Sequence, residues 1–215
     1  MGATADSIIE RRRLRRRLAF WRILAILVGL ALVLSLVPWG APGRRGRHVA
    51  EMRVEGLIVN DPEMLAAIRR VRDRETAAAL VVRVASPGGT VAGSEALFET
   101  LRDVAEEKPV VAVIGEVAAS GGYLAAMGAD RIFARQNSIT GSIGVISQVP
   151  NVTELLDRLG ISYRAVKSAP LKAEPDPFTE PSEEAFDAVE QIVMESYRWF
   201  SGVVSERRGL EGPAL

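Results

Sequence analysis

Residues Pro109–Ala129 read PVVAVIGEVAASGGYLAAMGA and place one serine between an apolar run and a segment of small residues. The run Pro109–Gly115 predicts a buried strand, and Gly121–Ala129 predicts a closely packed helix. Ser120 would then stand at the helix start, beside backbone N–H groups that have no partner within the helix. Such a hydroxyl is either a common N-cap or a nucleophile beside oxyanion donors, and this stretch alone fits both interpretations.

Around this stretch, short apolar runs alternate with amphipathic segments, which predicts an α/β fold built from strand-helix units. The expected strands are Met52–Val59, Ala79–Ala85, Pro109–Gly115, Arg131–Ala134 and Tyr163–Lys167. The expected further helices are Pro62–Arg74, Ala92–Glu107, Asn151–Leu159 and a long one that begins at Ser182. Asp61 is the expected N-cap of the first, because Pro62 suits the first helical position. The last helix repeats apolar residues at three- and four-residue steps, which indicates a core or subunit contact.

A second glycine-rich turn follows the strand Ala79–Ala85. It reads Ser86-Pro-Gly-Gly-Thr90 and opens the next helix, so it also offers free backbone N–H groups. It lacks both the Gly-Lys-Ser/Thr of a phosphate loop and the glycine spacing of a dinucleotide loop. Because sites of open α/β folds form at one edge of the sheet, the two turns would bring two backbone donors together, as an oxyanion site requires.

Few residues of this chain could act as the general base for Ser120. The single histidine, His48, lies far upstream, and the chain has no cysteine. Arginine stays protonated in proteins, and only three of the 27 basic residues are lysines. Lys108 follows two glutamates as a solvated charge, whereas Lys167 and Lys172 bracket an apolar turn. These two are either surface lysines or include a base whose burial lowers its pKa from about 10.4 toward neutrality.

The N-terminal part has the character of a membrane signal. Ile23–Trp39 is an uncharged apolar run of 17 residues, near the lower limit of about 17 to 25 for a spanning helix. Seven arginines precede it and three follow closely, which predicts a cytoplasmic N-terminus and an extracytoplasmic remainder. No small-x-small pattern ends the run, so an uncleaved signal anchor is favoured over a cleaved signal peptide. The basic segment before it is interpreted as a topogenic and lipid-headgroup signal.

Charge and composition argue against several functions. The net charge is zero, but residues 48–215 carry 17 basic and 25 acidic residues, a balance of −8. An acidic domain of this kind is a poor nucleic-acid binder. The absence of cysteine excludes disulfides and thiol catalysis. The lone histidine and the spacing of the carboxylates indicate no metal site, and no motif indicates an organic cofactor.

Together, these residues resemble the signal peptide peptidase A family (peptidase family S49), membrane-anchored serine proteases that use a Ser-Lys dyad. The resemblance covers about Met52–Leu210 and rests on several ordered motifs. The motifs are Ser86-Pro-Gly-Gly89, Ala119-Ser-Gly-Gly-Tyr123, Thr140-Gly-Ser-Ile-Gly-Val145 and Lys167-Ser-Ala-Pro-Leu-Lys172, with Pro177-Phe178 behind the last. The implied fold is shared with Clp protease and crotonases, with repeated ββα units preceded by one transmembrane helix.

The resemblance also implies roles for five residues. Ser120 would be the nucleophile, and Lys172, the second lysine of its motif, would be the base. Ser142 would hold the lysine amine, while Gly89 and Gly121 would offer N–H groups to the oxyanion. The implied substrates are remnant signal peptides and other extended apolar peptides. Short members of the family form rings in which neighbouring subunits share each active site, so a homo-oligomer is implied.

The resulting domain prediction is a basic cytoplasmic segment (1–22), a transmembrane signal anchor (23–39), a linker (40–50) and a peptidase S49-like catalytic domain (51–215). The expected location is a bacterial plasma membrane, with the catalytic domain on the extracytoplasmic face. Family members usually continue beyond the last helix with another segment and strand, which predicts a C-terminally shortened form. Two alternatives remain: an impaired peptide-binding scaffold, and a crotonase-like acyl-CoA enzyme that needs neither Ser120 nor Lys172. A Clp-type triad needs a histidine after Ser120, and none exists.

Overall fold

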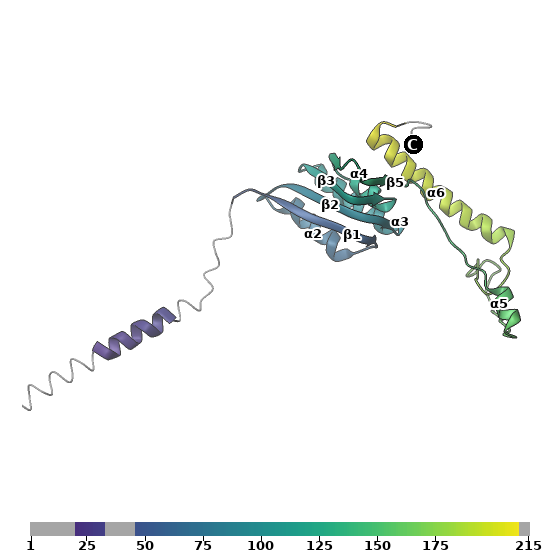
Figure 1. The fold of residues 1–215 in the computed structure, drawn as a ribbon, viewed down its shortest axis with the longest axis horizontal. Coiled ribbons are helices and arrows are strands. Elements are labelled where there is room, and N and C mark those ends of the chain that lie inside the picture. The colour runs from purple at the N-terminus through teal and green to yellow at the C-terminus, as the bar shows by residue number, and fades with distance from the viewer. Residues whose placement is uncertain (1–19, 33–45, 211–215) are drawn as a thin grey trace, which may run out of the picture. The chain divides into compact units, whose positions relative to one another are not determined.

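A five-stranded parallel sheet is the centre of the structure. The computed structural model describes residues 20–32 and 46–210, and its sheet has the order β1-β2-β3-β4, with β5 paired to β3 (Figure 1). All of these pairings are parallel. The prediction of an α/β fold is confirmed. The strands are β1 (His48–Ile58), β2 (Ala77–Gly89), β3 (Val110–Ala119), β4 (Arg131–Ala134) and β5 (Ile139–Gly141).

The strand β3 changes partner along its length. Its first part, Val111 to Ile114, pairs with β4, and its last part, Val117 to Ala119, pairs with β5. The last residue of β3 lies directly before Ser120, and the last residue of β5 lies directly before Ser142. The register of this short pairing therefore brings the two serine-bearing turns to the same end of the sheet.

Three helices follow the first three strands: α2 (Pro62–Asp73), α3 (Val91–Ala105) and α4 (Gly121–Met127). The predicted cap of α2 is confirmed, since the Asp61 carboxylate accepts hydrogen bonds from the N–H groups of Glu63 and Met64 at 2.9 and 3.1 Å. Thr90 caps α3 in the same way. Because parallel strands must be joined by crossovers, each helix returns the chain to the start of the next strand. The turns that leave β2 and β3 thus share one sheet edge.

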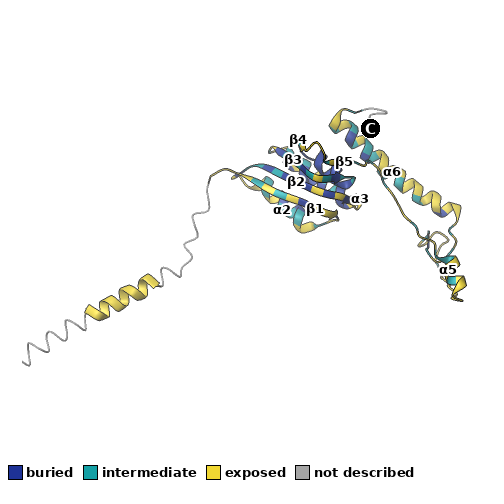
Figure 2. Cartoon of the chain, in the orientation of Figure 1, coloured by how far each residue is buried: buried dark blue, intermediate teal, exposed yellow. Residues whose placement is uncertain are grey.

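The core lies between the sheet and the helices α2, α3 and α4, with α3 contributing several of its large side chains. Alternate residues of β2 are buried, as expected for a strand, and α3 buries residues at three- and four-residue spacing, as expected for a helix. Figure 2 shows these elements as mainly buried or half-buried, in contrast to the exposed surfaces of α6. Full burial of each large aliphatic side chain contributes about 1.5–3 kcal/mol. The buried side chains here include Leu80, Val82 and Val84 of β2 with Leu97, Leu101 and Val104 of α3.

A second apolar cluster holds the long helix α6 (Glu183–Arg208) against α4. Tyr123, Leu124 and Met127 of α4 pack with Phe200 and Val204 of α6. Earlier in the same helix, the largest apolar side chains of the predicted stripe are exposed. They include Phe186, Ile192 and Tyr197. The stripe is therefore core only towards its C-terminal end, and the interpretation of the rest as a subunit contact stays a prediction.

The strand predicted at Tyr163–Lys167 is wrong, because this segment has no regular secondary structure. A strand exists only where a neighbour completes its hydrogen-bond ladder, and among residues 20–32 and 46–210 no strand pairs with the segment. It follows the short helix α5 (Thr153–Arg158), and Figure 1 shows this part at the far end of α6, away from the sheet. The strand β5 was not predicted, since three residues are too few to show the alternation of apolar and polar residues that indicates a strand.

The N-terminal predictions are only partly covered by the structure. Residues 20–32 are helical, whereas residues 33–39 of the expected anchor (23–39) and residues 1–19 lie outside the described part. Among residues 20–32 and 46–210, no helix combines the length and apolarity needed to cross a membrane. The strand β1 begins at His48, inside the stretch expected as a linker (40–50). Residues 46–210 belong to one compact unit.

Candidate active site

Ser120 joins β3 to α4 in a conformation that serine rarely adopts. Its φ is 50° and its ψ is −121°, and its side chain makes no capping hydrogen bond to the helix. A capping serine accepts a hydrogen bond from the first turn of its helix, and Ser120 accepts none. The N-cap interpretation of this serine is therefore wrong. A positive φ costs a non-glycine residue about 1–3 kcal/mol, and such strain clusters at active sites. The turn leaves the hydroxyl free for another role.

The turn Ser86–Thr90 is held from inside by the buried Ser86 hydroxyl. This hydroxyl donates to the Gly56 carbonyl at 2.6 Å and accepts from the Gly88 N–H at 3.1 Å. Gly88 has a φ of 113°, which only glycine adopts readily. A side chain there would lie 3.0 Å from both the Gly121 nitrogen and the Ser120 Cβ. The two glycine turns predicted to meet are in direct contact.

Gly89 and Gly121, the predicted oxyanion donors, have no room for a side chain. A Cβ at Gly89 would collide with the Ile58 carbonyl, and a Cβ at Gly121 would collide with the Ser94 hydroxyl. The position that a Cβ would take on Gly121 lies 3.4 Å from the Gly89 nitrogen. The backbones of the two residues therefore approach each other closely beside Ser120, as a two-donor oxyanion site requires.

Ser120 borders two cavities, which we call the outer groove and the inner cavity. The outer groove has a volume of about 680 Å³ and is lined by Ser120, Gly89 and Ser142, among others. Ser142 also has a positive φ, 53°, and it is exposed at the end of β5. The inner cavity has a volume of about 90 Å³ and is lined by Ser120, Gly89 and Gly121 with apolar side chains behind them. The structure thus brings together four of the five predicted site residues.

The fifth, Lys172, is not brought to Ser120 within the chain. It lies in the turn that follows α5 and borders neither the outer groove nor the inner cavity. Its side chain is exposed and has no hydrogen bond or ion pair with any described residue. The Lys172 amine is free to meet a group outside its own chain.

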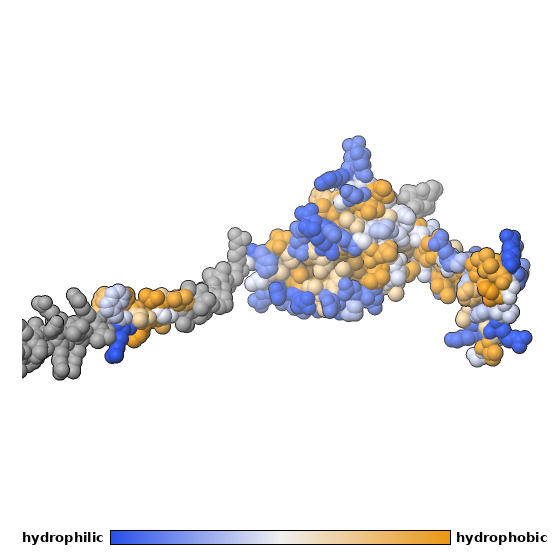
Figure 3. Space-filling view, turned by 60° about the horizontal axis from the view of Figure 1, so that its bottom comes forward, coloured by the Kyte–Doolittle hydropathy of each residue, from blue (hydrophilic) through white to orange (hydrophobic). Residues whose placement is uncertain are grey.

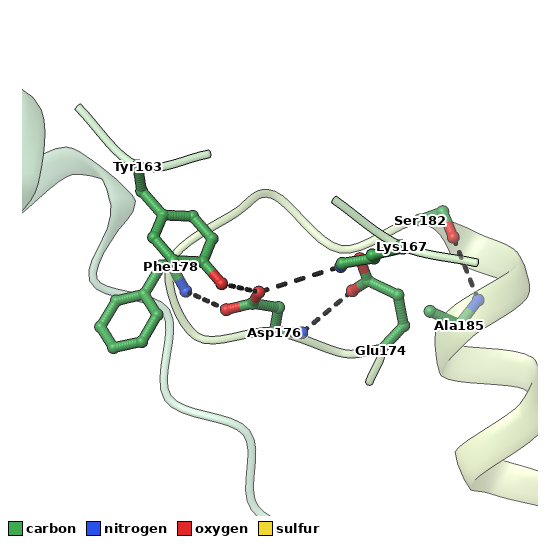
Figure 4. A network of polar contacts seen from close by, with 7 residues as sticks. All are labelled: Tyr163, Lys167, Glu174, Asp176, Phe178, Ser182 and Ala185. Atoms are coloured by element: carbon green, nitrogen blue, oxygen red, sulfur yellow. Dashed lines mark hydrogen bonds and ion pairs between the residues drawn. The ribbon is translucent and has the colours of Figure 1, made fainter. Parts of the chain in front are cut away.

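Lys167, the other lysine of the motif, is fully engaged (Figure 4). Its amine donates to the Glu174 carboxylate at 2.6 Å and lies 3.8 Å from the Asp176 carboxylate. Asp176 accepts further hydrogen bonds from the Tyr163 hydroxyl and the Phe178 N–H, each at 2.9 Å. The N–H of Asp176 in turn donates to Glu174 at 2.9 Å. We call Tyr163, Lys167, Glu174 and Asp176 the loop network.

The loop network keeps Lys167 charged. The hydrogen bond to Glu174 raises the pKa of the Lys167 amine above its ordinary value, and the same bond lowers the pKa of Glu174. The Phe178 N–H lowers the pKa of Asp176. A general base must be neutral to accept a proton, so Lys167 in this arrangement is unsuited to that role. The acidic partners of Lys167 were not foreseen from the sequence, although Glu174 and Asp176 follow the lysine motif closely.

Sequence reasoning also missed Ser94, which lines the inner cavity from α3. Its residue is 2% exposed, and its hydroxyl has no hydrogen-bond partner. A serine one turn after a helix cap carries no signal of its own in a sequence. Across residues 20–32 and 46–210, no three His, Cys, Asp or Glu side chains gather closely enough to hold a metal ion.

A family model and several protease-named relatives point to one family. The model of peptidase family S49 matches residues 102–215, more than half of the chain. A Synechocystis sp. protein provisionally named a protease is 35% identical over 76% of this chain and 60% of its own length. An Enterococcus faecium protein provisionally named a signal peptide peptidase SppA is 28% identical over 80% of this chain and 54% of its own. The chain thus spans little more than half the length of these relatives.

A solved structure, a ClpP1 mutant from Listeria monocytogenes, is similar over 75% of this chain and 73% of its own, with 13% identity and a TM-score of 0.47. Family membership rests on the sequence matches, which include the turn with Ser120 and the segment with both lysines. By this match, the chain belongs to peptidase family S49.

Proposed function

We propose that the protein is a membrane-anchored serine endopeptidase in which Ser120 is the nucleophile and Lys172 the general base. The observation that carries this proposal is the strained, uncapped Ser120 held beside the backbones of Gly89 and Gly121. A helix-capping serine would need neither the positive φ nor the second glycine turn. The Clp-like fold class belongs to the same proposal, whereas the predicted ββα repeat is wrong for this part of the chain, because α2, α3 and α4 each follow a single strand.

In the proposed reaction, the Ser120 hydroxyl attacks the carbonyl of the scissile peptide bond. The N–H groups of Gly89 and Gly121 stabilise the negative charge that develops on the carbonyl oxygen. Neutral Lys172 takes the proton of Ser120 and returns it to the leaving amine, which gives an acyl enzyme. A water molecule then attacks the ester, gives its proton to Lys172, and releases the acid product as Ser120 recovers its own. Ser142 would hold the lysine amine for these transfers.

We further propose that the dyad forms between two subunits of a homo-oligomer. Lys172 is unpartnered and borders neither cavity at Ser120 in its own chain, which is the arrangement expected if it serves a neighbour. The segment that carries α5 exposes large apolar side chains, and Figure 3 shows hydrophobic patches there beside hydrophilic ones. They include Leu155, Leu159, Ile161 and Val166. An exposed apolar surface of this kind is typical of a subunit interface.

The proposed substrates are extended apolar peptides, including remnant signal peptides, cleaved on the extracytoplasmic face. Support comes from the outer groove, whose walls include the exposed side chains of Leu57, Val59 and Ile146. These side chains would be covered by an apolar peptide that passes Ser120. The N-terminal run that was interpreted as an anchor would hold the site near the membrane, where such peptides remain.

Labelling with a serine-reactive fluorophosphonate across pH tests the proposal. Wild-type protein should be labelled at Ser120, with a rate that rises as the base loses its proton, and Ser120→Ala should not be labelled. Co-expression of Ser120→Ala with Lys172→Arg then tests the shared site, because mixed oligomers recover activity only if one chain's serine meets the other's lysine. No labelling of a folded oligomer would instead support the peptide-binding scaffold.

A further inference from the structure

The segment that carries Lys172 has no regular secondary structure. Residues 159–182 form neither a helix nor a strand, and most of them are exposed. An exposed segment without a backbone ladder is ordinarily mobile. A general base must instead be held within hydrogen-bond reach of the proton that it takes, since a misplacement of about 1 Å costs a factor of about 100 in rate. Some other interaction must therefore hold Lys172 if it is the base.

The loop network closes the chain into a loop around Lys172. Lys167 precedes the proposed base and Glu174 follows it, and the 2.6 Å ion pair between these two residues joins the ends of the loop. The exposed fractions of the two side chains are 19% and 14%, so water competes weakly for either charge. The loop therefore has paired, partly buried ends and carries the exposed Lys172 between them.

The backbone within this loop is tightly turned. The Lys172 N–H donates to the Ala169 carbonyl at 3.1 Å, and the Glu174 N–H donates to the Leu171 carbonyl at 3.2 Å. Ala173, directly after Lys172, has a φ of 61°, which is unfavourable for a residue other than glycine. A strained residue persists only where its surroundings hold it. The ion pair at the ends of the loop lies in the position to do so.

The loop network is also fixed to its surroundings. The Asp176 carboxylate accepts from the Tyr163 hydroxyl and the Phe178 N–H, and the centres of the two aromatic rings lie 5.1 Å apart (Figure 4). The Val152 N–H, at the start of α5, donates to the Pro177 carbonyl at 2.9 Å. The ends of the loop are therefore connected to α5 as well as to each other.

We propose that Glu174 is a positioning residue for the base, and that it acts through its ion pair with Lys167. The pair holds the loop in the shape that presents the Lys172 amine to Ser120 of a neighbouring subunit. This assignment rests on the proposed dyad and adds the interaction that keeps the base in place. Neither Lys167 nor Glu174 takes part in proton transfer. Removal of one partner leaves the other as a partly buried charge, so the loop should open to solvate it.

The rate of fluorophosphonate labelling of Ser120 in the oligomer of the full chain measures the effect. Glu174→Gln keeps the size of the side chain and removes its charge, and we expect the rate to fall about 10- to 100-fold. In a Lys172→Ala background, the same substitution should change the rate by less than about twofold, because no amine is left to position. A purely structural role would give the same fold-loss in both backgrounds, and that result would overturn the assignment.

Substitutions at Lys167 test whether the ion pair is the cause. Lys167→Met should slow labelling by the same factor as Glu174→Gln, and the double variant should be no slower than either, because all three lack the same contact. Lys167→Arg keeps a cation opposite Glu174 and should keep most of the wild-type rate. Glu51→Gln is the matched control, because it removes a 2.8 Å contact with Arg83 between side chains that are 45% and 53% exposed. It should be labelled at the wild-type rate.

Gel filtration and thermal unfolding establish that each variant is a folded oligomer at the assay temperature. If Glu174→Gln does not fold, Glu174→Asp takes its place in both backgrounds, since aspartate keeps the charge on a shorter side chain. A wild-type labelling rate in the folded Glu174 variant overturns this assignment alone. If wild-type protein is not labelled at all, the proposed function fails, and this assignment fails with it.

Discussion

The N–H of Ser120 donates a hydrogen bond of 2.8 Å to the carbonyl of Gly141. This bond connects the turn after β3 to the end of β5. Ser142 directly follows Gly141, the residue that accepts the bond from Ser120. A strained residue persists only where its surroundings hold it from several sides. For Ser120 these include the Gly141 carbonyl and the Leu124 N–H, which donates to the Ser120 carbonyl at 3.0 Å.

Replacement of Ser120 by glycine should abolish activity and increase stability. Glycine adopts a positive φ without steric cost, so we expect the free energy of unfolding to rise by about 1 kcal/mol. Peptide hydrolysis should fall to background, because no hydroxyl remains. Urea unfolding and a chromatographic peptide assay measure the two effects. Ser120→Ala is the control that loses activity but keeps the strain, and full hydrolysis by either variant would remove Ser120 as the nucleophile.

Replacement of Lys172 by arginine should reduce kcat by about 10²- to 10⁴-fold, the usual contribution of a general base. Arginine keeps the positive charge but does not lose its proton. Lys167→Arg is the matched control, since arginine can still pair with Glu174, and we expect it to keep most of the activity. Steady-state kinetics on one peptide measure both variants. An inactive Lys167→Arg together with an active Lys172→Arg would assign the base to Lys167.

A methyl group at Gly89 should destabilise the fold and reduce activity together. The new Cβ would collide with the Ile58 carbonyl, so the backbone must move, at a cost of about 1–3 kcal/mol. Movement of Gly89 also displaces a proposed oxyanion donor. Gly202→Ala is the control, because it lies within α6 with open space around it, and it should gain about 0.5–1 kcal/mol. A Gly89→Ala variant as stable and active as wild type would contradict the close approach.

Stability should depend on acid pH through the loop network. The pKa of Glu174 is lowered by its hydrogen bond with Lys167, so the folded state binds a proton less readily than the unfolded state. The contribution of Glu174 is therefore complete above its ordinary pKa of 4.5 and is lost as pH falls through the lowered value. Lys167 has the opposite sign, and its contribution is lost only as pH rises through its raised pKa.

Thermal unfolding between pH 3 and pH 7 measures this effect. Glu174→Gln should remove part of the decrease in unfolding temperature that wild-type protein shows below about pH 4.5. The control is Glu154→Gln, which removes the same charge from an exposed ion pair with Arg158 on α5. We expect Glu154→Gln to follow the wild-type curve, because exposed pairs contribute little. Parallel curves for wild-type protein and Glu174→Gln would contradict the pKa shift.

Much of the fold could be predicted because its signals are local. The apolar runs of β1 to β4 and the cap at Asp61 each depend on residues within one element and its ends. Two elements could not be predicted well. The strand β5 is three residues long and exists through its pairing with β3, and Tyr163–Lys167 has the composition of a strand but no pairing strand in the part of the chain that the structure describes.

The candidate site divides in the same way. The sequence alone predicted a glycine turn after each of two neighbouring strands and a lysine as the base of the proposed dyad, because strand ends, glycine positions and residue types can be read from short stretches of sequence. Only the tertiary structure decided that Ser120 is uncapped and strained, that Lys167 is paired with Glu174, and that Ser94 is buried without a partner. Each of these depends on a contact between segments far apart in the chain, and such contacts follow from packing and register rather than from local propensity.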